Sequence, residues 1–501
     1  MTHPSQPIWY DMAEMEFRPK LDHAVEVPLY RQLYEQIGQQ IRSGQIPKGE
    51  RLPATRELAG QLGLNRTTVS AAYELLETEG LISGQVGRGS FVTGGAAGRV
   101  DWPSVLERVD GTHTAPGSWS RDVISFAVSR PSRELFPLDD FRTSAQAVLS
   151  RADLPDILQL GSPAGYEPLR RYLIEEARRQ HLAAPGDDVL VTNGCQQAMD
   201  LIGRVLLRPG DNVAVEDPIY PGLKNLLTGM GAQLCGVPVG QDGMDAAALE
   251  RVLERDRPRF VVVTSNFQNP TGLTLSIAGR RAILDAAGRA GVPVIENDSY
   301  GELRYSGEPQ AAMKQLDDRG GTVLLRSFSK ISFPGLRVGW ALGPKPLMDR
   351  LRAAKEATDL HTDQLSQAVL LEFAESGRLA AHRARVLKAG AERLAATLDA
   401  CRDWLPAGSR WTRPEGGMNV WVRLPEPLDA GELLARAQRA GVAYLPGKFF
   451  AVGRFDATAL RLSFAGLAPE EILRGLEILG TLAKAELETA QSRFEPSPAM
   501  V

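Results

Sequence analysis

The sequence predicts a multidomain protein with a small, mostly helical module near the N-terminus, a large α/β domain, and a small α+β subdomain at the C-terminal end of that domain. The chain has 501 residues, which is too many for one hydrophobic core. Helical spacing of apolar residues dominates 28–93. From residue 121, short β-rich runs alternate with helical stretches, an alternation typical of a largely parallel sheet.

These patterns divide the chain into segments with different composition. We expect an N-terminal arm over 1–27, a compact module over 28–93, a linker over 94–120, an α/β domain over 121–485 and a tail over 486–501. The linker is assigned by its content of glycine, proline, serine and threonine. The strand candidates GMNVWVRL and ALRLSFA predict the smaller α+β subdomain after about residue 390.

Composition and charge narrow the class of protein. The net charge is −4, so any contact with nucleic acid must be local. The three cysteines, Cys195, Cys235 and Cys401, form no CxxC motif, which argues against a disulfide framework and against a metal site. We find neither a signal peptide nor a run of 18 apolar residues, and we therefore expect a cytoplasmic protein without membrane contact.

The module over 28–93 predicts a helix-turn-helix followed by a β-hairpin wing. Apolar residues at helical spacing place a first helix before Ser43-Gly44. A second helix is expected to have Thr55 as its N-cap and to end at Gly63. A third follows in NRTTVSAAYELLETEGL, and LISGQVGRGSFVTG then predicts two strands around a glycine turn with Arg88 at its tip.

The segment LPATRELAGQLGLNRTTVSAAYELLETEGLISGQVGRGSFV resembles the GntR-type winged helix over its whole length. The resemblance implies binding of double-stranded operator DNA, because the N-terminal end of the third helix would meet base edges and phosphates. The residues implied in DNA contact are Arg56, Arg66, Thr67, Thr68, Arg88 and Gly89.

The segment 28–93 is almost neutral, with seven Lys/Arg against six Asp/Glu. A winged helix that binds protein and not DNA is therefore an alternative. The distribution favours DNA: the arginines gather at helix starts and the wing, while Glu74, Glu77 and Glu79 lie at the far end of the third helix. With few phosphate contacts from one chain, useful affinity is expected to require two copies on one site.

In the large domain, the segment TVLLRSFSKISFPGLRVGW (322–340) predicts a strand that enters a serine-rich turn presenting Lys330. An amine on a rigid turn, flanked by hydroxyls and an arginine, suits a Schiff base to a phosphorylated aldehyde. Ser327, Ser329 and Arg337 would hold the phosphate. A lone lysine is usually a surface charge, so this interpretation depends on the segments upstream.

Four upstream segments place polar or aromatic residues where strands end. Cys195 and Gln196 open a helix whose N–H groups would face an anion. Tyr220 follows a strand as a platform for a planar ring, and Asn269 lies in the turn NPTG. The segment VPVIENDSYGEL ends a strand with the last set: Asn297, Asp298 and Tyr300.

Together, in this order, these segments resemble the fold type I pyridoxal-phosphate enzymes, specifically class I/II aminotransferases, over nearly all of 121–485. The resemblance implies pyridoxal 5'-phosphate as cofactor, with Lys330 forming the internal aldimine. It places Arg337, Ser327, Ser329, Cys195 and Gln196 around the phosphate. Tyr220 would stack on the ring, and Asn269 and Tyr300 would bond its phenolic oxygen. Arg461 matches the arginine that pairs a substrate α-carboxylate, and a strand arginine can make that bidentate fork.

A GntR-type winged helix joined to this domain resembles the MocR regulators, which also share the ELFP element at 134–137. The resemblance implies a homodimer whose DNA binding responds to an amino acid, an amine or the cofactor itself. It does not identify the effector, the target genes, or whether the protein activates or represses.

Three positions depart from the aminotransferase pattern. Active members have an aspartate three residues before the tyrosine equivalent to Tyr300; here that position is Asn297, and the carboxylate follows at Asp298. Neighbouring strand residues face opposite sides, so Asp298 can replace it only if the strand end bulges. Leu160 stands where a tyrosine is common, and the loop at Ser129 lacks a usual glycine.

The sequence therefore predicts a one-component regulator that senses an amino compound by aldimine chemistry at Lys330, and not primarily an enzyme. An active aminotransferase that carries a winged helix is the alternative. A degenerate domain kept only for dimerisation is a third interpretation, which the presence of Lys330 and Arg337 disfavours.

Overall fold

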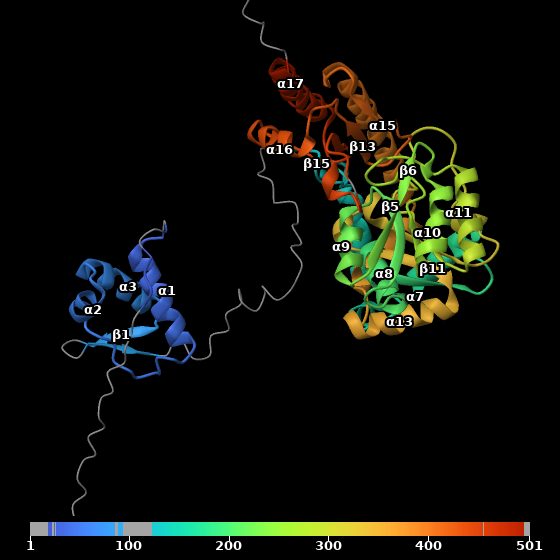
Figure 1. The fold of residues 1–501 in the computed structure, drawn as a ribbon. Helices are drawn as coiled ribbons and strands as arrows, with labels where there is room; N and C mark the ends of the chain where they lie inside the picture. Colours follow the sequence, from blue (N-terminus) through green and yellow to red (C-terminus); the bar gives the residue numbers. More distant parts are fainter. Residues whose placement is uncertain are drawn as a thin grey trace, which may run out of the picture. The chain divides into compact units, whose positions relative to one another are not determined.

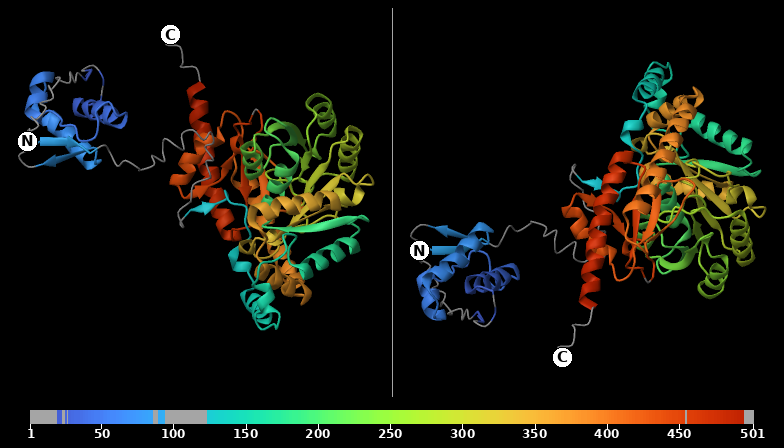
Figure 2. Two further views of the ribbon diagram at one scale, coloured as in Figure 1. Left: turned by 90° about the horizontal axis from the view of Figure 1, so that it is seen from below. Right: turned by 90° about the horizontal axis from the view of Figure 1, so that it is seen from above.

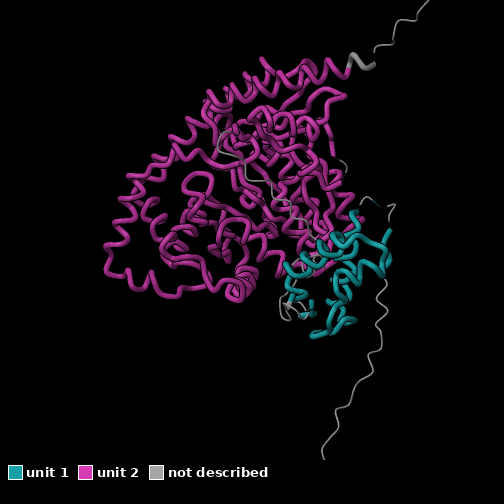
Figure 3. Tube along the Cα trace, turned by 90° about the vertical axis from the view of Figure 1, so that its left-hand side faces the viewer, with its two compact units in different colours: residues 1–112 teal, residues 113–501 magenta. Residues whose placement is uncertain are grey.

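The computed structural model describes residues 19–22, 25, 27–85, 89–93, 123–453 and 455–494. The chain divides into two compact units, Met1–Thr112 and His113–Val501 (Figure 3). The expected linker over 94–120, most of the expected arm over 1–27 and Arg88 lie outside the described residues. Within the described ranges, no helix is long and apolar enough to cross a membrane, and no group of three or more His, Cys, Asp or Glu could hold a metal ion.

The first unit contains the predicted helices and hairpin (Figure 1). Its elements are α1 (Leu29–Arg42), α2 (Thr55–Leu62), α3 (Arg66–Thr78), β1 (Ile82–Gln85) and β2 (Gly89–Val92). The apolar faces meet in one core that includes Leu33, Ile37, Leu58, Val69 and Leu76. Helical spacing in the sequence therefore identified the packed face of each helix correctly.

The ends of α2 and α3 set the turn between them. The prediction that Thr55 caps α2 is wrong: the cap is Ala54, whose carbonyl accepts the first helical hydrogen bond, from Leu58 N–H at 2.9 Å. Gly63 ends α2 in the left-handed conformation (φ 65°), as predicted. Asn65 caps α3, its side-chain oxygen accepting from Thr67 N–H at 3.1 Å.

The second unit is built on an eight-stranded sheet in the order β4-β11-β10-β9-β8-β5-β6-β7. The strands are β4 (Asp187–Thr192), β5 (Asn212–Asp217), β6 (Gln233–Gly240), β7 (Gly243–Met244), β8 (Val261–Val263), β9 (Val294–Asn297), β10 (Thr322–Ser327) and β11 (Gly339–Pro344). Neighbours from β10 through β9, β8 and β5 to β6 are parallel, whereas β11 and β7 are antiparallel to their neighbours. The predicted, largely parallel sheet is confirmed.

Helices cover both faces of this sheet (Figures 1 and 2). One face packs on α8 (Cys195–Leu206), α9 (Pro221–Gly229) and α13 (Lys345–Asp359). The other packs on α7 (Glu167–Arg179), α10 (Ala246–Asp256), α11 (Ile277–Ala290) and α14 (Gln364–Glu375). The strands are apolar on both sides: in β8, Val261 and Val263 belong to one cluster and Val262 to the other. Shorter helices are α5 (Leu138–Leu149), α6 (Leu154–Ile157) and α12 (Met313–Leu316).

The predicted α+β subdomain contains the sheet β12-β13-β16-β15. Its strands are β12 (Arg410–Trp411), β13 (Asn419–Arg423), β15 (Leu445–Pro446) and β16 (Ala459–Ser463), and its helices are α15 (Arg378–Trp404), α16 (Ala430–Arg439) and α17 (Pro469–Phe494). A short pair, β3 (Ile124–Ser125) with β14 (Val442–Ala443), joins the start of the domain to this end. One face of the sheet, with Val420 and Leu462, packs into the core with α15 and α17.

The boundary that we expected at 485 falls inside a helix, because α17 continues to Phe494. Apolar residues at helical spacing, among them Leu476, Leu479 and Ala483, bury one side of α17 against the core. The helix then continues beyond these buried residues, where sequence composition alone suggested a frayed end.

Candidate functional site

The predicted site residues of the second unit follow strands that end at one edge of the large sheet. β4 and β10 are both antiparallel to β11, so they run in the same direction as β5, β8 and β9. The carboxyl ends of these strands therefore lie along one edge, which is where ligands bind in open α/β sheets. The segments that follow these strands carry Cys195, Tyr220, Asn269, Tyr300 and Lys330.

An anion cradle lies at the start of α8. Gly194 precedes the helix with φ 83°, and the first N–H groups of a helix have no partner within it. Arg337 reaches this point: Nη2 donates to Asn193 O at 3.0 Å and Nη1 to Ser329 Oγ at 3.4 Å. Ser327 Oγ donates to Ser329 Oγ at 2.7 Å. A guanidinium, hydroxyls and a helix N-terminus, the donors that a phosphate group needs, thus meet at one point.

Two glycines keep this cradle open. A Cβ on Gly194 would lie 2.5 Å from Arg337 Nη2. A Cβ on Gly339, at the start of β11, would lie 2.7 Å from the Cα of Gly194. Any side chain at either position would therefore displace the arginine or the helix start.

Lys330 ends the short 3-10 helix Phe328–Lys330 that follows β10. Its Nζ donates to the carbonyl of Ser129 at 3.0 Å and lies 5.4 Å from the centre of the Tyr300 ring. The amine is therefore held over an aromatic face and against the segment that follows β3. Among the described residues, no carboxylate pairs with Lys330 Nζ.

Arg461 joins the small subdomain to this cluster from β16. Its Nη1 donates to Asn269 Oδ1 at 3.2 Å, and its Nη2 donates to the carbonyl of Ala127. Asn269 Nδ2 in turn donates to Tyr300 Oη at 3.3 Å. Three of the predicted residues, from three separate segments, are thus in one hydrogen-bonded chain.

The guanidinium of Arg461 is 2% exposed, and its Nε has no hydrogen-bond partner among the described residues. Burial lowers the pKa of Arg461 to about 10, against the opposing effect of Tyr300 and Tyr220, so the group remains charged at neutral pH. A buried cation with a free donor attracts an anion strongly, since it has lost its own hydration. This is the chemistry expected of a carboxylate-binding arginine.

Asn297 and Asp298 point to different networks. Asn297 Oδ1 accepts from Ser299 Oγ at 2.7 Å, and Ser299 Oγ lies 3.3 Å from Cys195 Sγ at the start of α8. Burial raises the pKa of the Cys195 thiol, which favours an uncharged group beside the cradle. Asn297 therefore faces the side of the strand end on which Ser299 and Cys195 lie.

Asp298 does not meet the condition under which it could replace the missing aspartate at Asn297, because the strand register is regular up to Asn297. Its side chain is 1% exposed; one carboxylate oxygen accepts from Asn266 Nδ2 at 2.8 Å and the other pairs with Arg326 Nη2 at 2.8 Å. Both oxygens are thereby committed to the network behind the strand end. The physical reason is the alternation of strand residues: no bulge turns Asp298 to the side of Asn297.

Tyr220 and Gln196 are neighbours at the mouth of the cradle. A Cβ on Gly222 would lie 2.5 Å from the Tyr220 ring, so the ring folds back over the start of α9. Gln196 Nε2 donates to the Gly222 carbonyl at 3.3 Å. Tyr220 stays 43% exposed, which leaves a ring face available beside the cradle.

In the first unit, the residues predicted to contact DNA lie at helix starts. Arg56, Arg66 and Thr67 are exposed, and Thr68 is half-buried. Gly89 begins β2 with φ 102°, and a Cβ there would lie 3.0 Å from Arg51 Nε. The base of the wing therefore carries the Arg51 guanidinium beside Gly89, a contact that the sequence pattern did not predict.

Comparisons with known proteins agree with both units. A family described as "Bacterial regulatory proteins, gntR family" matches residues 29–92, and "Aminotransferase class I and II" matches residues 121–479. The probable rhizopine catabolism regulatory protein MocR of Rhizobium meliloti is 31% identical over 92% of this chain and 94% of its own length. The chain belongs to the MocR-type regulators.

The aminotransferase relationship of this MocR-type chain is equally clear in sequence and structure. Aromatic-amino-acid aminotransferase 1 of Thermococcus litoralis is 35% identical over 73% of this chain and 89% of its own length. The structure of the α-aminoadipate aminotransferase LysN from Thermus thermophilus superposes with a TM-score of 0.69 at 35% identity, covering 74% of this chain and 94% of that one. This MocR-type chain is a DNA-binding transcriptional regulator whose large domain takes pyridoxal 5'-phosphate as cofactor.

Sequence reasoning missed several groups that complete the site of this MocR-type domain. The carbonyls of Ala127 and Ser129 hold Arg461 and Lys330, and a backbone acceptor leaves no mark in a sequence. Asn193 holds Arg337, and Ser299 links Asn297 to Cys195. Ser299 was detectable as a polar residue between two predicted site residues.

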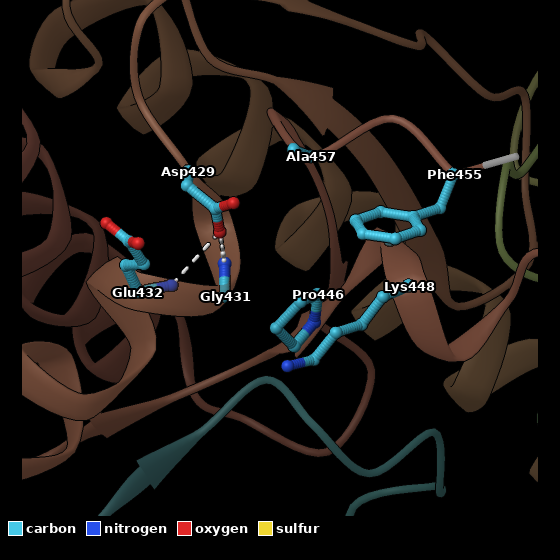
Figure 4. Close-up of a pocket in the computed structure, with 8 residues that line it drawn as sticks. Asp429, Gly431, Glu432, Pro446, Lys448, Phe455 and Ala457 are labelled. Atoms are coloured by element: carbon cyan, nitrogen blue, oxygen red, sulfur yellow. Dashed lines mark hydrogen bonds between the residues drawn. The ribbon is translucent and has the colours of Figure 1, made fainter.

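A separate pocket of about 230 Å³ lies at the start of α16 (Figure 4). Its lining includes Asp429, Glu432, Lys448 and Phe455. Asp429 already accepts from the N–H groups of Gly431, at 2.6 Å, and Glu432, at 3.1 Å, so the chain itself caps this helix. No predicted site residue lines this pocket.

Proposed function

We propose that this MocR-type regulator senses an amino acid at the Lys330–Arg461 site and that binding changes how paired winged helices hold an operator. The observation that carries the proposal is the separation of Asn297 from Asp298. The residues suited to binding an amino acid are assembled, while the residue next to the cofactor ring has no negative charge.

Each predicted site residue of the large domain has a defined role in binding. Lys330 would hold the cofactor covalently, and Ser327, Ser329, Arg337 and the start of α8 would hold its phosphate. When bound, pyridoxal phosphate supplies an aldehyde carbon on which a ligand amine can exchange with the lysine amine. Asn269 and Tyr300 orient the ring through its oxygen, and Tyr220 covers its face.

Asn297 decides between sensing and turnover. An asparagine can hydrogen-bond a ring nitrogen, but it supplies no charge to hold a proton there. Asn297 would therefore give little help to removal of the ligand α-proton, which depends on a protonated ring. Ligand capture is therefore retained and transamination is weakened.

A route from the site to the linker follows from two hydrogen bonds. Lys330 and Arg461 both donate to carbonyls of residues 127–129, directly after β3 and the expected linker over 94–120. Attachment of the cofactor would engage the Lys330 amine, and a ligand amine that replaces it would free Lys330 to donate to Ser129 O, while the ligand carboxylate would draw Arg461 away from Ala127 O. We infer that this exchange of donors on residues 127–129 transmits binding toward the winged helix.

Two copies of the chain are expected to act together. Leu158 and Leu160 are 64% and 72% exposed, and large apolar side chains at such exposure favour a covering partner. The winged helix alone has few phosphate contacts, so a homodimer on a two-part operator would supply the affinity.

The direct test is a titration of the purified full-length protein with amino acids and amines, followed by visible absorption, oxo-acid assay and DNA affinity. We expect one amino acid to shift the cofactor band and to alter DNA affinity without releasing oxo acid. Bleaching of the band with stoichiometric oxo acid would instead identify an aminotransferase, the alternative that the intact Lys330, Asn269, Tyr300 and Arg461 set favours.

Asn297→Asp tests the reason for weak turnover. We expect the oxo-acid release rate to rise by about 100-fold, since one preorganised charge at a reacting group has effects of this order. The matched control is Asp298→Asn, which makes the opposite exchange one residue away. It should lower the unfolding temperature by breaking the Arg326 pair and leave the rate unchanged. An equal rate in wild type and Asn297→Asp would contradict the proposal.

Arg66→Ala tests the DNA contact. The exposed guanidinium at the start of α3 should contribute about 1–3 kcal/mol to operator binding, so affinity should fall by about 5- to 150-fold. The slope of log affinity against log salt should fall by about one per subunit if the contact is a phosphate. Fluorescence anisotropy on a duplex selected from a randomised pool measures both. Arg31→Ala, on α1, is the charge-matched control and should behave as wild type.

A further inference from the structure

An asparagine in the small subdomain has both side-chain polar atoms unpaired. Asn419 begins β13, is 0% exposed, and neither its Oδ1 nor its Nδ2 has a hydrogen-bond partner among the described residues. A buried group without a partner destabilises a protein by about 1–3 kcal/mol. A carboxamide with two such atoms therefore calls for a physical explanation.

The strand register places Asn419 on the same face of the sheet as Arg461. In the β13–β16 pair, Trp421 lies opposite Arg461, and Asn419 lies opposite Ser463. Residues directly opposite one another share a face, and so do residues two apart on one strand. Asn419 and Arg461 are thus diagonal neighbours, with Cβ atoms about 7 Å apart.

The opposite face of this sheet is the apolar core. Val420 and Leu462 belong to the cluster that packs against α15 and α17. Asn419 therefore faces the side on which Arg461 reaches Asn269, and not the packed interior of the subdomain. The unpaired Nε of Arg461 lies on the same side.

Contacts on both flanks tie Asn419 to the predicted site. A Cβ on Gly272 would lie 2.4 Å from Asn419 O, so the turn that carries Asn269 packs on the Asn419 backbone. On the other flank, Ser129 Oγ lies 3.7 Å from the sulfur of Met418, and Ser129 O accepts from Lys330 Nζ. Asn419 lies between the segments that hold the lysine and the arginine.

We propose that Asn419 determines ligand specificity: it binds the side chain of the sensed amino acid, which ends in a neutral carboxamide or hydroxyl. The inference rests on the proposed amino-acid sensing and adds the class of ligand. Arg461 binds the carboxylate of the sensed amino acid, and Lys330 exchanges with its amine. Asn419 therefore contacts the remaining group, the side chain of that amino acid.

The two unpaired atoms define what that side chain carries. Nδ2 donates and Oδ1 accepts, so only a group that both accepts and donates satisfies both. A carboxylate would leave Oδ1 facing a negative charge, and an ammonium would leave Nδ2 unpaired. An apolar side chain would leave both atoms buried and unpaired, the situation in which binding sites discriminate most strongly.

The first test compares amino acids of similar size in full-length, cofactor-loaded protein by calorimetric titration. The pairs are L-asparagine with L-leucine, L-glutamine with L-methionine, and L-threonine with L-valine. We expect the polar member of at least one pair to bind at least about tenfold tighter, and Asn419→Leu to abolish that preference. The pair that responds distinguishes a carboxamide ligand from a hydroxyl ligand, and L-glutamate should bind more weakly than L-glutamine.

Two results would overturn the inference, and they differ. If amino acids bind but the ratio within each pair is the same in wild type and Asn419→Leu, sensing stands and the role of Asn419 is wrong. If no amino acid binds wild type, in this set or in the wider panel that tests the proposed function, amino-acid sensing fails, and the role of Asn419 fails with it.

The second test needs no ligand. Asn419→Leu removes two unpaired polar atoms and keeps the volume, so the unfolding temperature of the ligand-free protein should rise by about 2 °C or more. The control is Gln367→Met. This equally buried amide accepts from Tyr166 N–H at 2.8 Å and donates to Thr362 O at 2.9 Å, so its loss should lower the temperature. A fall in Asn419→Leu as large as in the control would overturn the proposal, because it would show the amide to be paired without ligand.

Discussion

Replacement of Lys330 by alanine is expected to abolish the visible cofactor band and every ligand-dependent change in DNA affinity. Lys330 is the amine that the structure holds at the end of β10, above Tyr300 and against Ser129 O. Without it the cofactor has no covalent attachment, and ligand binding frees no lysine amine to donate to the carbonyl of Ser129. Absorption spectra and operator titrations with and without the active amino acid measure the two losses.

The winged helix should be unaffected in this variant, because its core is formed by α1, α2 and α3 with the hairpin. Ligand-free DNA affinity therefore serves as the internal control, and it should change only by the contribution of the resting lysine contact. Ligand-dependent DNA binding that persists in Lys330→Ala would refute sensing at this site.

Arg461→Met should raise the dissociation constant for the sensed amino acid by at least about 100-fold. Removing one partner of a buried charge pair has effects of about 2–5 kcal/mol or more, because the ligand carboxylate is then desolvated without a cation. The residue is buried, and its Nε, which has no hydrogen-bond partner among the described residues, would meet the ligand carboxylate. Calorimetric titration of the full-length protein measures the change.

A matched pair of ligands separates this effect from general damage. The amine that lacks the carboxylate should bind wild type and Arg461→Met with similar affinity. Arg461→Lys should recover only part of the amino-acid affinity, since an ammonium cannot form the bidentate fork. Equal weakening for the amino acid and its amine would mean that Arg461 acts on the shape of the site and not on the carboxylate.

Much of the site was predictable because chemistry and order were both visible in the chain. Lys330, with serines before it and Arg337 after it, predicted the attachment point, and strand ends upstream predicted the segments that the structure brings beside it. The helices of the winged module were predictable from apolar spacing, since burying one face is what makes short helices stable. Thr55 was misassigned because cap geometry depends on which carbonyl accepts the first helical bond, and Ala54 does so here.

The sequence could not show on which side of the strand end the side chains of Asn297 and Asp298 lie. The sequence has an amide and a carboxylate side by side, at Asn297 and Asp298. Only the structure shows Asp298 paired with Arg326 and Asn266, on the side away from Ser299 and Cys195. The proposed loss of charge at the ring depends on that orientation.

Local sequence determined which elements form and which residue types carry the chemistry, because turns, caps and apolar periodicity act over a few residues. Tertiary structure alone decided which backbone carbonyls hold Lys330 and Arg461, and which buried amides have partners. Gln367 and Asn419 are both amides in apolar runs of the sequence, yet one is fully paired and the other is not. That difference depends on contacts between segments far apart in the chain, which no local pattern records.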